Sequence, residues 1–357
     1  MTHRLDTADG DDSRHMMSIA ISTGLSFGLF QNVPQALALP YCPKLWRRIA
    51  WTCFTTDCQI ALRLRRRPLI RDVDFCHPVL TEDDFGDQLQ SSNNQILSTA
   101  WPLAWDSQMQ RTLTDLSIAN ARLCVCIRDV LKVQAKDTIT PTATPISPIS
   151  EASDNDSEYT ARAHASEAKL AEWANKLPAT CHCHPTEPSS VDDNPVIFMQ
   201  RRLLQMKFYT TVAVFHQSRP FPWSTFCVQH AAHQITRTAS ELYQRKLQSR
   251  LPLVGVTAIL IALVIHISQM KGPPGEQREQ ATQNFQYALA IMANLRDLYR
   301  EASSVTAWAL KIMKNVVFDE GSETNRHHTP KLSNVAGGSS KPILPVGLQG
   351  FVPEQSA

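Results

Sequence analysis

The clearest hydrophobic pattern of the chain lies between residues 44 and 65. Apolar residues recur there at steps of four and seven, at Leu45, Ile49, Cys53, Ile60 and Leu64. Further apolar residues widen this stripe, namely Trp46, Ala50, Phe54 and Ala61. Such spacing places side chains on one face of a helix. Pro68 has no backbone N–H and disfavours helical geometry in the residue before it, so we expect this helix to end before residue 68.

The same helical period returns in seven other segments of the chain. They are 12–28, 108–134, 165–177, 196–217, 226–248, 252–270 and 279–315. No convincing series of strands appears, and nothing repeats at a fixed period. The sequence therefore predicts an all-α, multi-helix fold.

Two stretches lack a helical period and set the expected domain boundaries. Residues 134–164 include a tract rich in Ser, Thr and Pro, and residues 319–357 carry Gly, Ser and Pro. Both compositions are typical of disordered segments, which bury too little apolar surface to fold. We therefore expect residues 1–133 and 165–318 to be two parts of one helical domain, joined by a disordered linker and followed by a disordered tail.

Composition and charge limit the classes of function. The chain has 357 residues, of which 43% are hydrophobic, so it can bury at least one large core. Its formal net charge is +2, whereas a dedicated nucleic-acid-binding domain usually carries a strong basic excess. This balance argues against DNA binding by the whole surface.

The cysteines indicate neither a metal centre nor a disulfide framework. The chain has nine of them, and no two have the C-x-x-C spacing of structural zinc sites. We expect Cys124 and Cys126 to be small core residues, and Cys181–His184 to be a polar loop, because adjacent residues cannot all face one ion. An odd cysteine count without a signal peptide favours a reducing, intracellular compartment.

The longest apolar run, residues 251–267, predicts a buried helix rather than a membrane span. The run is free of charge, but it contains Pro252, Gly255 and His266. It is also shorter than the roughly 20 residues that a spanning helix needs. We expect no association with a membrane.

One short motif resembles a catalytic element, but its context excludes the reaction. Residues 24–28 match G-x-S-x-G, the nucleophile elbow of α/β-hydrolases, which requires several strands before the serine. Only 25 residues precede Ser26, so we interpret the motif as a helix end with Gly28 as its stop. Other phosphate-binding, dinucleotide and metalloprotease motifs are absent from the sequence. We therefore expect that the chain is not an enzyme.

The residues between 44 and 85 resemble a known family signature. It combines a helix with basic residues and a tryptophan, an Asp near its centre, an Arg-Pro pair and an Ile-x-Asp-x-Asp-Phe segment. The matching positions are Arg47, Arg48, Trp51, Asp57, Arg67, Pro68, Ile70, Asp72, Asp74, Phe75 and Pro78. This pattern resembles the fungal-specific transcription factor domain, or middle homology region, of zinc binuclear cluster regulators. Residues 18–32, 170–178 and 203–221 are similar to further elements of that family.

The resemblance implies a transcription regulator of the fungal nucleus, controlling metabolic or secondary-metabolite genes. Regulators of this family carry six cysteines that bind two zinc ions, and no such cluster precedes Met1. We therefore expect either that the domain is truncated at its start or that the chain is a regulator-like protein without its own DNA reader. In both cases we expect zinc only in the missing cluster and no cofactor in this chain. Contact with DNA would then be indirect, through a full-length regulator or the transcription machinery, with a small-molecule effector as a further partner.

An alternative function remains open on the sequence alone. A helical protein that does not bind DNA could act through a partner, or could be an enzyme or small-molecule carrier. In that case we would expect residues 196–270 to line its pocket.

The arginines after residue 62 admit two interpretations. Four of them could form an import signal, namely Arg63, Arg65, Arg66 and Arg67. They could also neutralise acids of the same domain, since Asp57 interrupts an apolar helix face and a buried charge needs a partner. We hypothesise that Asp57 accepts a bidentate bond from Arg67 or Arg71.

Overall fold

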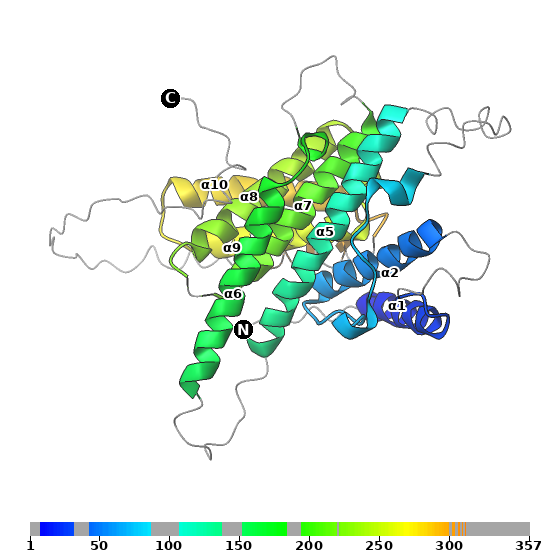
Figure 1. The fold of residues 1–357 in the computed structure, drawn as a ribbon. Coiled ribbons are helices and arrows are strands. Elements are labelled where there is room, and N and C mark those ends of the chain that lie inside the picture. Colours follow the sequence, from blue (N-terminus) through cyan, green and yellow to red (C-terminus); the bar gives the residue numbers. More distant parts are fainter. Residues whose placement is uncertain are drawn as a thin grey trace, which may run out of the picture. The chain divides into compact units, whose positions relative to one another are not determined.

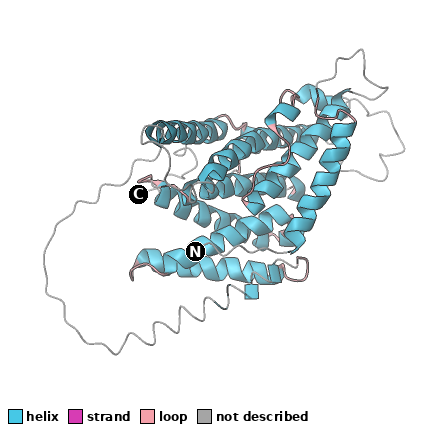
Figure 2. Ribbon diagram, turned by 90° about the horizontal axis from the view of Figure 1, so that it is seen from below, coloured by secondary structure: helices cyan, strands magenta, loops and turns pink. Residues whose placement is uncertain are grey.

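The computed structural model describes most of the chain, and all of the described secondary structure is helical. The described residues are 8–31, 43–86, 107–137, 152–183, 194–219, 221–299, 302–303, 306–307, 309 and 311. Figure 2 shows helices and loops over these ranges and no strand. The predicted all-α class is confirmed.

The chain divides into two compact units, residues 1–211 with 346–357, and residues 212–345. The helices of the first unit are α1 (Ala8–Ser26), α2 (Pro43–Leu64), α5 (Ser107–Asp137), α6 (Ala152–Asn175) and most of α7 (Pro195–Gln217) (Figure 1). Its short 3-10 turns are η2 (Asp72–Asp74), η3 (Glu82–Phe85) and η5 (Ala179–Cys181). The second unit contains the end of α7, then α8 (Ser224–Gln244), η7 (Gln248–Arg250), α9 (Leu253–Met270) and α10 (Glu276–Asn294).

Helix α5 is central to the first unit, since α2 and α6 both pack against it. Its apolar stripe is fully buried at Leu123, Ile127 and nearly so at Leu131. Trp173 of α6 donates a hydrogen bond from Nε1 to the carbonyl oxygen of Ala119, at 3.0 Å, which fixes α6 along α5. Burial of such long side chains supplies most of the helix-pairing free energy.

The buried face of α2 differs from the predicted stripe by about a quarter turn. Its buried residues are Ala50, Trp51, Phe54, Asp57, Cys58, Ala61 and Leu62. Leu45 and Ile49, which began the predicted stripe, are 44% and 42% exposed. The apolar stripe of residues 44–65 is wider than one helix face, so the sequence does not determine which side of the helix is buried. Packing against α5 determines it.

Two helices of this unit end in the same hydrogen-bonded motif. At the end of α1, Gly28 has φ +69°, and Leu29 N–H donates to Gly24 O at 2.8 Å. At the end of α2, Arg65 has φ 51°, and Arg66 N–H donates to Ala61 O at 3.0 Å. Both are Schellman ends, which favour glycine at the left-handed position. The helix stop expected at Gly28 is therefore confirmed, whereas arginine occupies the equivalent position after α2.

The expected linker is shorter than residues 134–164. Helix α5 continues to Asp137 and α6 begins at Ala152, so the predicted boundaries are wrong at both ends. Helical period continues upstream of residue 165, because Ala163 is fully buried and Glu158 pairs with Arg162 one turn later at 2.6 Å. Residues 138–151 and the predicted tail 319–357 lie outside the described residues.

The predicted helix 279–315 is interrupted by a turn at residues 295–298, and the described residues 302–303, 306–307, 309 and 311 are again helical. Helix α10 stops at Asn294, and a turn follows without glycine or proline. Leu295 is fully buried there, and the Tyr299 hydroxyl donates to Leu251 O at 2.6 Å. These tertiary contacts end the helix where the local sequence would continue it.

Helix α9 forms the core of the second unit, packed against α8 and α10. It is the one helix in the described ranges that is long and apolar enough to cross a membrane. Most of its side chains are nevertheless buried within the protein, including the polar His266. The prediction of a buried helix over this apolar run agrees with that packing.

Replacing Arg65 by glycine is expected to raise the melting temperature of the protein. A residue with a Cβ loses about 1–2 kcal/mol of stability in the left-handed conformation, and glycine avoids this cost. About half of that benefit is lost again, because glycine has more conformational freedom in the unfolded state. Thermal unfolding followed by circular dichroism measures the effect. Gly28→Ala is the matched control and should lower the melting temperature; an Arg65→Gly protein that melts below the parent would contradict the argument.

Candidate functional site

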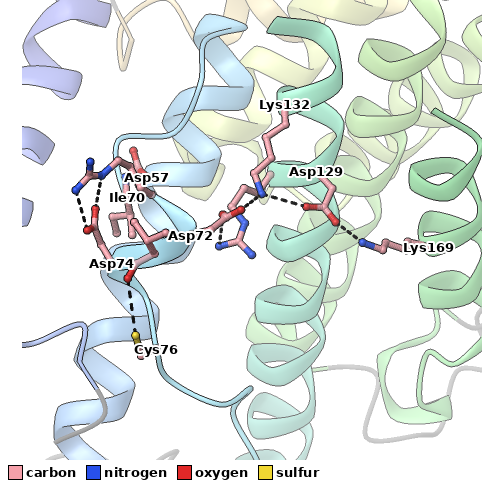
Figure 3. Close-up of polar contacts among 11 residues, drawn as sticks. Asp57, Ile70, Asp72, Asp74, Cys76, Asp129, Lys132 and Lys169 are labelled. Carbon is pink, nitrogen blue, oxygen red and sulfur yellow. Dashed lines mark hydrogen bonds and ion pairs between the residues drawn. The ribbon is translucent and has the colours of Figure 1, made fainter. Parts of the chain in front are cut away.

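The signature residues converge on Asp57, which lies on the buried face of α2. Its side chain is only 1% exposed, and Oδ2 accepts a hydrogen bond from the Ile70 amide at 2.8 Å (Figure 3). Burial raises the pKa of Asp57, while the Ile70 and Leu69 amides and the charge of Arg14 limit that rise. The carboxylate therefore binds the chain that returns after Pro68 to its own helix.

The hypothesis that Asp57 pairs with Arg67 or Arg71 is wrong. Arg71 makes two parallel bonds to Asp74, from Nε at 2.7 Å and from Nη2 at 3.0 Å. Arg67 instead presents its carbonyl oxygen, which accepts from Arg14 Nη2 of α1 at 3.2 Å. The Ile70 amide bonds one carboxylate oxygen without burying a second charge, whereas Oδ1 is buried without a hydrogen-bond partner among the described residues.

An aromatic cluster forms around Phe75, the last residue of the Ile-x-Asp-x-Asp-Phe segment. Its ring centroid lies 5.0 Å from Trp51 and 4.7 Å from Phe54, both on α2. The Phe30 ring, after α1, lies 6.1 Å away. Trp51 also donates from Nε1 to Pro78 O at 2.9 Å. The signature aromatics therefore hold the returning segment against two helices.

The returning segment also bonds to the end of α1 through its backbone. Cys76 N–H donates to Phe30 O at 2.9 Å, and the His77 ring contacts Leu29 O through Nε2 at 2.7 Å. Gly24 of α1 packs closely against the Phe30 ring, since a Cβ at residue 24 would lie only 3.0 Å from that ring. Helix α1 and the segment after α2 thus form one packed piece.

A buried carboxylate anchors the far end of the segment to the first turns of α2. Asp84 accepts from Arg47 Nη1 at 2.7 Å, and its side chain is fully buried. Its other oxygen accepts from Thr81 N at 2.9 Å, which completes the capping box expected before this turn. Asp84 therefore stabilises the turn at residues 81–85 and joins it to Arg47 of α2.

Asp72 connects the chain that returns after Pro68 to α5 and, through α5, to α6. It accepts ion pairs from Arg128 at 3.1 Å and from Lys132. Lys132 also lies 3.5 Å from Asp129, which pairs with Lys169 of α6 at 2.6 Å (Figure 3). Partial burial acts to raise the pKa of Asp72, but the Lys132 hydrogen bond and the Arg128 charge lower it overall.

The four candidate import arginines surround the end of α2. Arg63 is in its last turn, and Arg65 to Arg67 follow in the left-handed turn. Arg65 and Arg67 are exposed, whereas Arg63 and Arg66 are partly buried. The structure thus presents these charges on a hydrogen-bonded turn rather than on an extended peptide. The import function stays a prediction.

The cysteines do not form a metal site within the described residues. Burial raises the pKa of Cys124 to about 11 and of Cys126 to about 12, so both thiols stay protonated at neutral pH. Cys181 is buried in η5, and His182 contacts Leu177 O at 3.0 Å. His184, the last residue of the expected polar loop, lies outside the described residues.

The contacts of the signature residues bind segments of the first unit to one another. Ser26, the serine of the G-x-S-x-G match, donates its hydroxyl to Ser22 O at 3.0 Å on an exposed helix face. Arg47, Trp51, Asp57, Asp72 and Phe75 meet their partners inside one packed unit. Arg48 stands apart from this centre, with its guanidinium 5.8 Å from the Phe85 ring centroid.

Sequence reasoning missed three residues that complete the site. Asp84 is one of them, and its buried ion pair with Arg47 makes it an anchor. Arg128 and Lys132 stand one turn apart on α5, and this i, i+4 spacing was the available signal for a shared acidic partner. Their partner Asp72 is 60 positions from Lys132, a pairing that no local pattern specifies.

Comparison with protein families identifies the domain. Residues 5–175 match the model of the fungal specific transcription factor domain. The matched range includes the signature segment, α5 and α6. The family resemblance is therefore confirmed, and this part of the chain is a fungal specific transcription factor domain.

Three curated relatives agree with that result. Cutinase transcription factor 1 beta of Fusarium vanettenii is 34% identical over 344 residues, 89% of this chain and 38% of that protein. A transcription factor of Fusarium pseudograminearum (strain CS3096) is 24% identical over 345 residues, 90% of this chain and 38% of that protein. Cutinase transcription factor 1 alpha of F. vanettenii is 22% identical over 306 residues, 82% of this chain and 30% of that protein. The chain thus spans 30–38% of the length of these relatives, and no solved structure matches it.

One aromatic contact joins the family-matched range to a helix that lies beyond it. Trp173, from the segment similar to the family's Trp-x-x-x-Leu-Pro element, stacks on Phe208 with centroids 5.3 Å apart. Phe208 belongs to the helix similar to the family's Tyr-containing element. The first unit therefore brings the resembling segments together.

Replacing Asp57 by alanine is expected to destabilise the protein by about 1–3 kcal/mol, because the buried Ile70 amide loses its acceptor. The melting temperature should fall, as measured by calorimetry. Thr56→Ala is the matched control on the exposed side of the same turn and should change it little. An Asp57→Ala protein with the parent melting temperature would show that the carboxylate is not the anchor.

Proposed function

We propose that the chain is the regulatory part of a fungal transcription regulator. The observation that carries this proposal is the agreement between the family match over residues 5–175 and the buried Asp57–Ile70 contact that assembles the signature. The three relatives are transcription factors, which supports a role in regulation rather than catalysis.

The partners and targets follow from the same proposal. Contact with DNA is indirect, through a full-length regulator or the transcription machinery, and the chain itself needs no cofactor. Metabolic genes are the proposed targets, and cutinase genes are the first to test, because two relatives are named cutinase transcription factors. A small-molecule effector would be a further partner.

A tethered reporter tests the regulatory function. The whole chain, fused to an unrelated DNA-binding domain in a filamentous fungus, is expected to change transcription from a promoter with the matching sites, in either direction. Thr56→Ala should keep the effect and Asp57→Ala should reduce it, because the latter loosens the signature. Unchanged transcription with a soluble, folded fusion would contradict the proposal.

We propose nuclear residence as part of this function, with the basic turn after α2 as the import signal. Arg65 and Arg67 are the exposed members of that turn. In a fluorescent fusion of the chain, Arg65→Gln with Arg67→Gln is expected to lower nuclear accumulation. The control pair Arg245→Gln and Arg250→Gln, also exposed, should leave it unchanged. Equal accumulation of all three proteins would exclude this import signal.

A further inference from the structure

Three histidines gather between the helices of the second unit. His230 and His233 lie on α8, and His266 lies on α9. His266 is 1% exposed, His230 is half-buried, and His233 is exposed to solvent. The rings act electrostatically on one another, since His233 affects both His230 and His266.

His266 is held as a neutral ring with a defined tautomer. Its Nδ1 lies 2.9 Å from Gln269 Oε1, an acceptor, so Nδ1 carries the proton. Its Nε2 then accepts from the Thr236 hydroxyl of α8 at 3.0 Å. This bond joins α9 to α8 deep in the unit.

His233 connects α8 to α10, and its Nδ1 is an acceptor, whereas Nδ1 of His266 is a donor. Its Nδ1 lies 3.1 Å from Asn284 Nδ2, and an amide nitrogen can only donate, so Nδ1 must be unprotonated. The orientation of the Asn284 amide is supported by Gln280 Nε2, which donates to Asn284 Oδ1 at 3.4 Å. A proton on His233 Nδ1 would place two donors against each other.

The surroundings oppose positive charge on these rings. Burial lowers the pKa of all three histidines. His233 lowers the pKa of His230 and His266 further, and Arg237 lowers that of His233, while hydrogen bonds to Gln269 and to the Ala232 backbone limit the fall for His266. Arg237 itself pairs with Glu241 at 3.2 Å. From α10 the facing groups are the neutral Asn284 and Gln280, and no carboxylate acts on the rings within the described part of the unit.

We propose that the histidine cluster, defined as His230, His233 and His266, makes the second unit acid-sensitive, with protonation of His233 releasing α10 from α8. This proposal does not depend on the regulatory function. This release is confined to α8 and α10, because the hydrogen bond that breaks joins only these two helices.

The sign of the pH dependence follows from linkage. The folded-state pKa values lie below the ordinary histidine value of 6.5, so the unfolded or opened state binds more protons. The stabilisation is complete above about pH 6.5 and is lost as the pH falls through the folded-state values. Acidification therefore favours the open state, whereas pH above 7 leaves the contact closed.

Hydrogen exchange of the full chain, read by mass spectrometry and corrected for the intrinsic pH effect, tests this inference. Between pH 7.5 and 5.5, peptides of α8 and α10 are expected to lose protection while those of α5 keep theirs. His233→Gln should remove most of that loss, because a glutamine oxygen accepts from Asn284 and does not titrate. His164→Gln, on the exposed face of α6, is the control and should respond as the parent does.

Asn284→Asp supplies a second, independent variant. A carboxylate opposite His233 raises the imidazole pKa and makes its protonated form favourable, so acid should no longer open the contact. Parent protein whose α10 keeps full protection at pH 5.5 would overturn the proposal. So would a parent-like acid response in both His233→Gln and Asn284→Asp.

Discussion

The hydrogen bond between the Asp57 carboxylate and the Ile70 amide is the constraint on which the first unit depends. A carboxylate on the buried face of a helix is unfavourable unless donors surround it, and here the donors come from the chain that follows the helix. The helix must therefore end at a fixed residue and the chain must turn back at once. The left-handed Arg65 and the rigid Pro68 permit that turn.

Once the turn is fixed, the rest of the segment has little freedom. Phe75 reaches the aromatic rings of α2, and Asp72 faces the cations of α5. Asp84 returns the chain to Arg47 near the start of α2. The acids and aromatics of the family signature are thus structural, since each binds another part of the same unit. A signature can identify a regulatory domain without marking a reactive site.

The two units use polar groups differently. In the first, buried carboxylates accept from backbone amides or cations and stay compatible with neutral pH. In the second, neutral histidines join α8 to α9 and α10 and lack acidic neighbours within the described residues. The same burial that keeps the first unit closed therefore makes the second responsive to protons, because imidazole titrates near neutrality and carboxylates do not.

The sequence by itself determined the helical class, the helix stop at Gly28 and the family of the signature, because these depend on period, local turn chemistry and residue spacing. It misplaced the linker, since a Ser-rich composition hid the helical period around Ala163. Only tertiary structure decided which face of α2 is buried and that Asp57 binds an amide instead of Arg67 or Arg71. It also brought Asp72 to Lys132 and His233 to Asn284. Those contacts join residues 13 to 60 positions apart, so they depend on how helices pack and not on any local pattern.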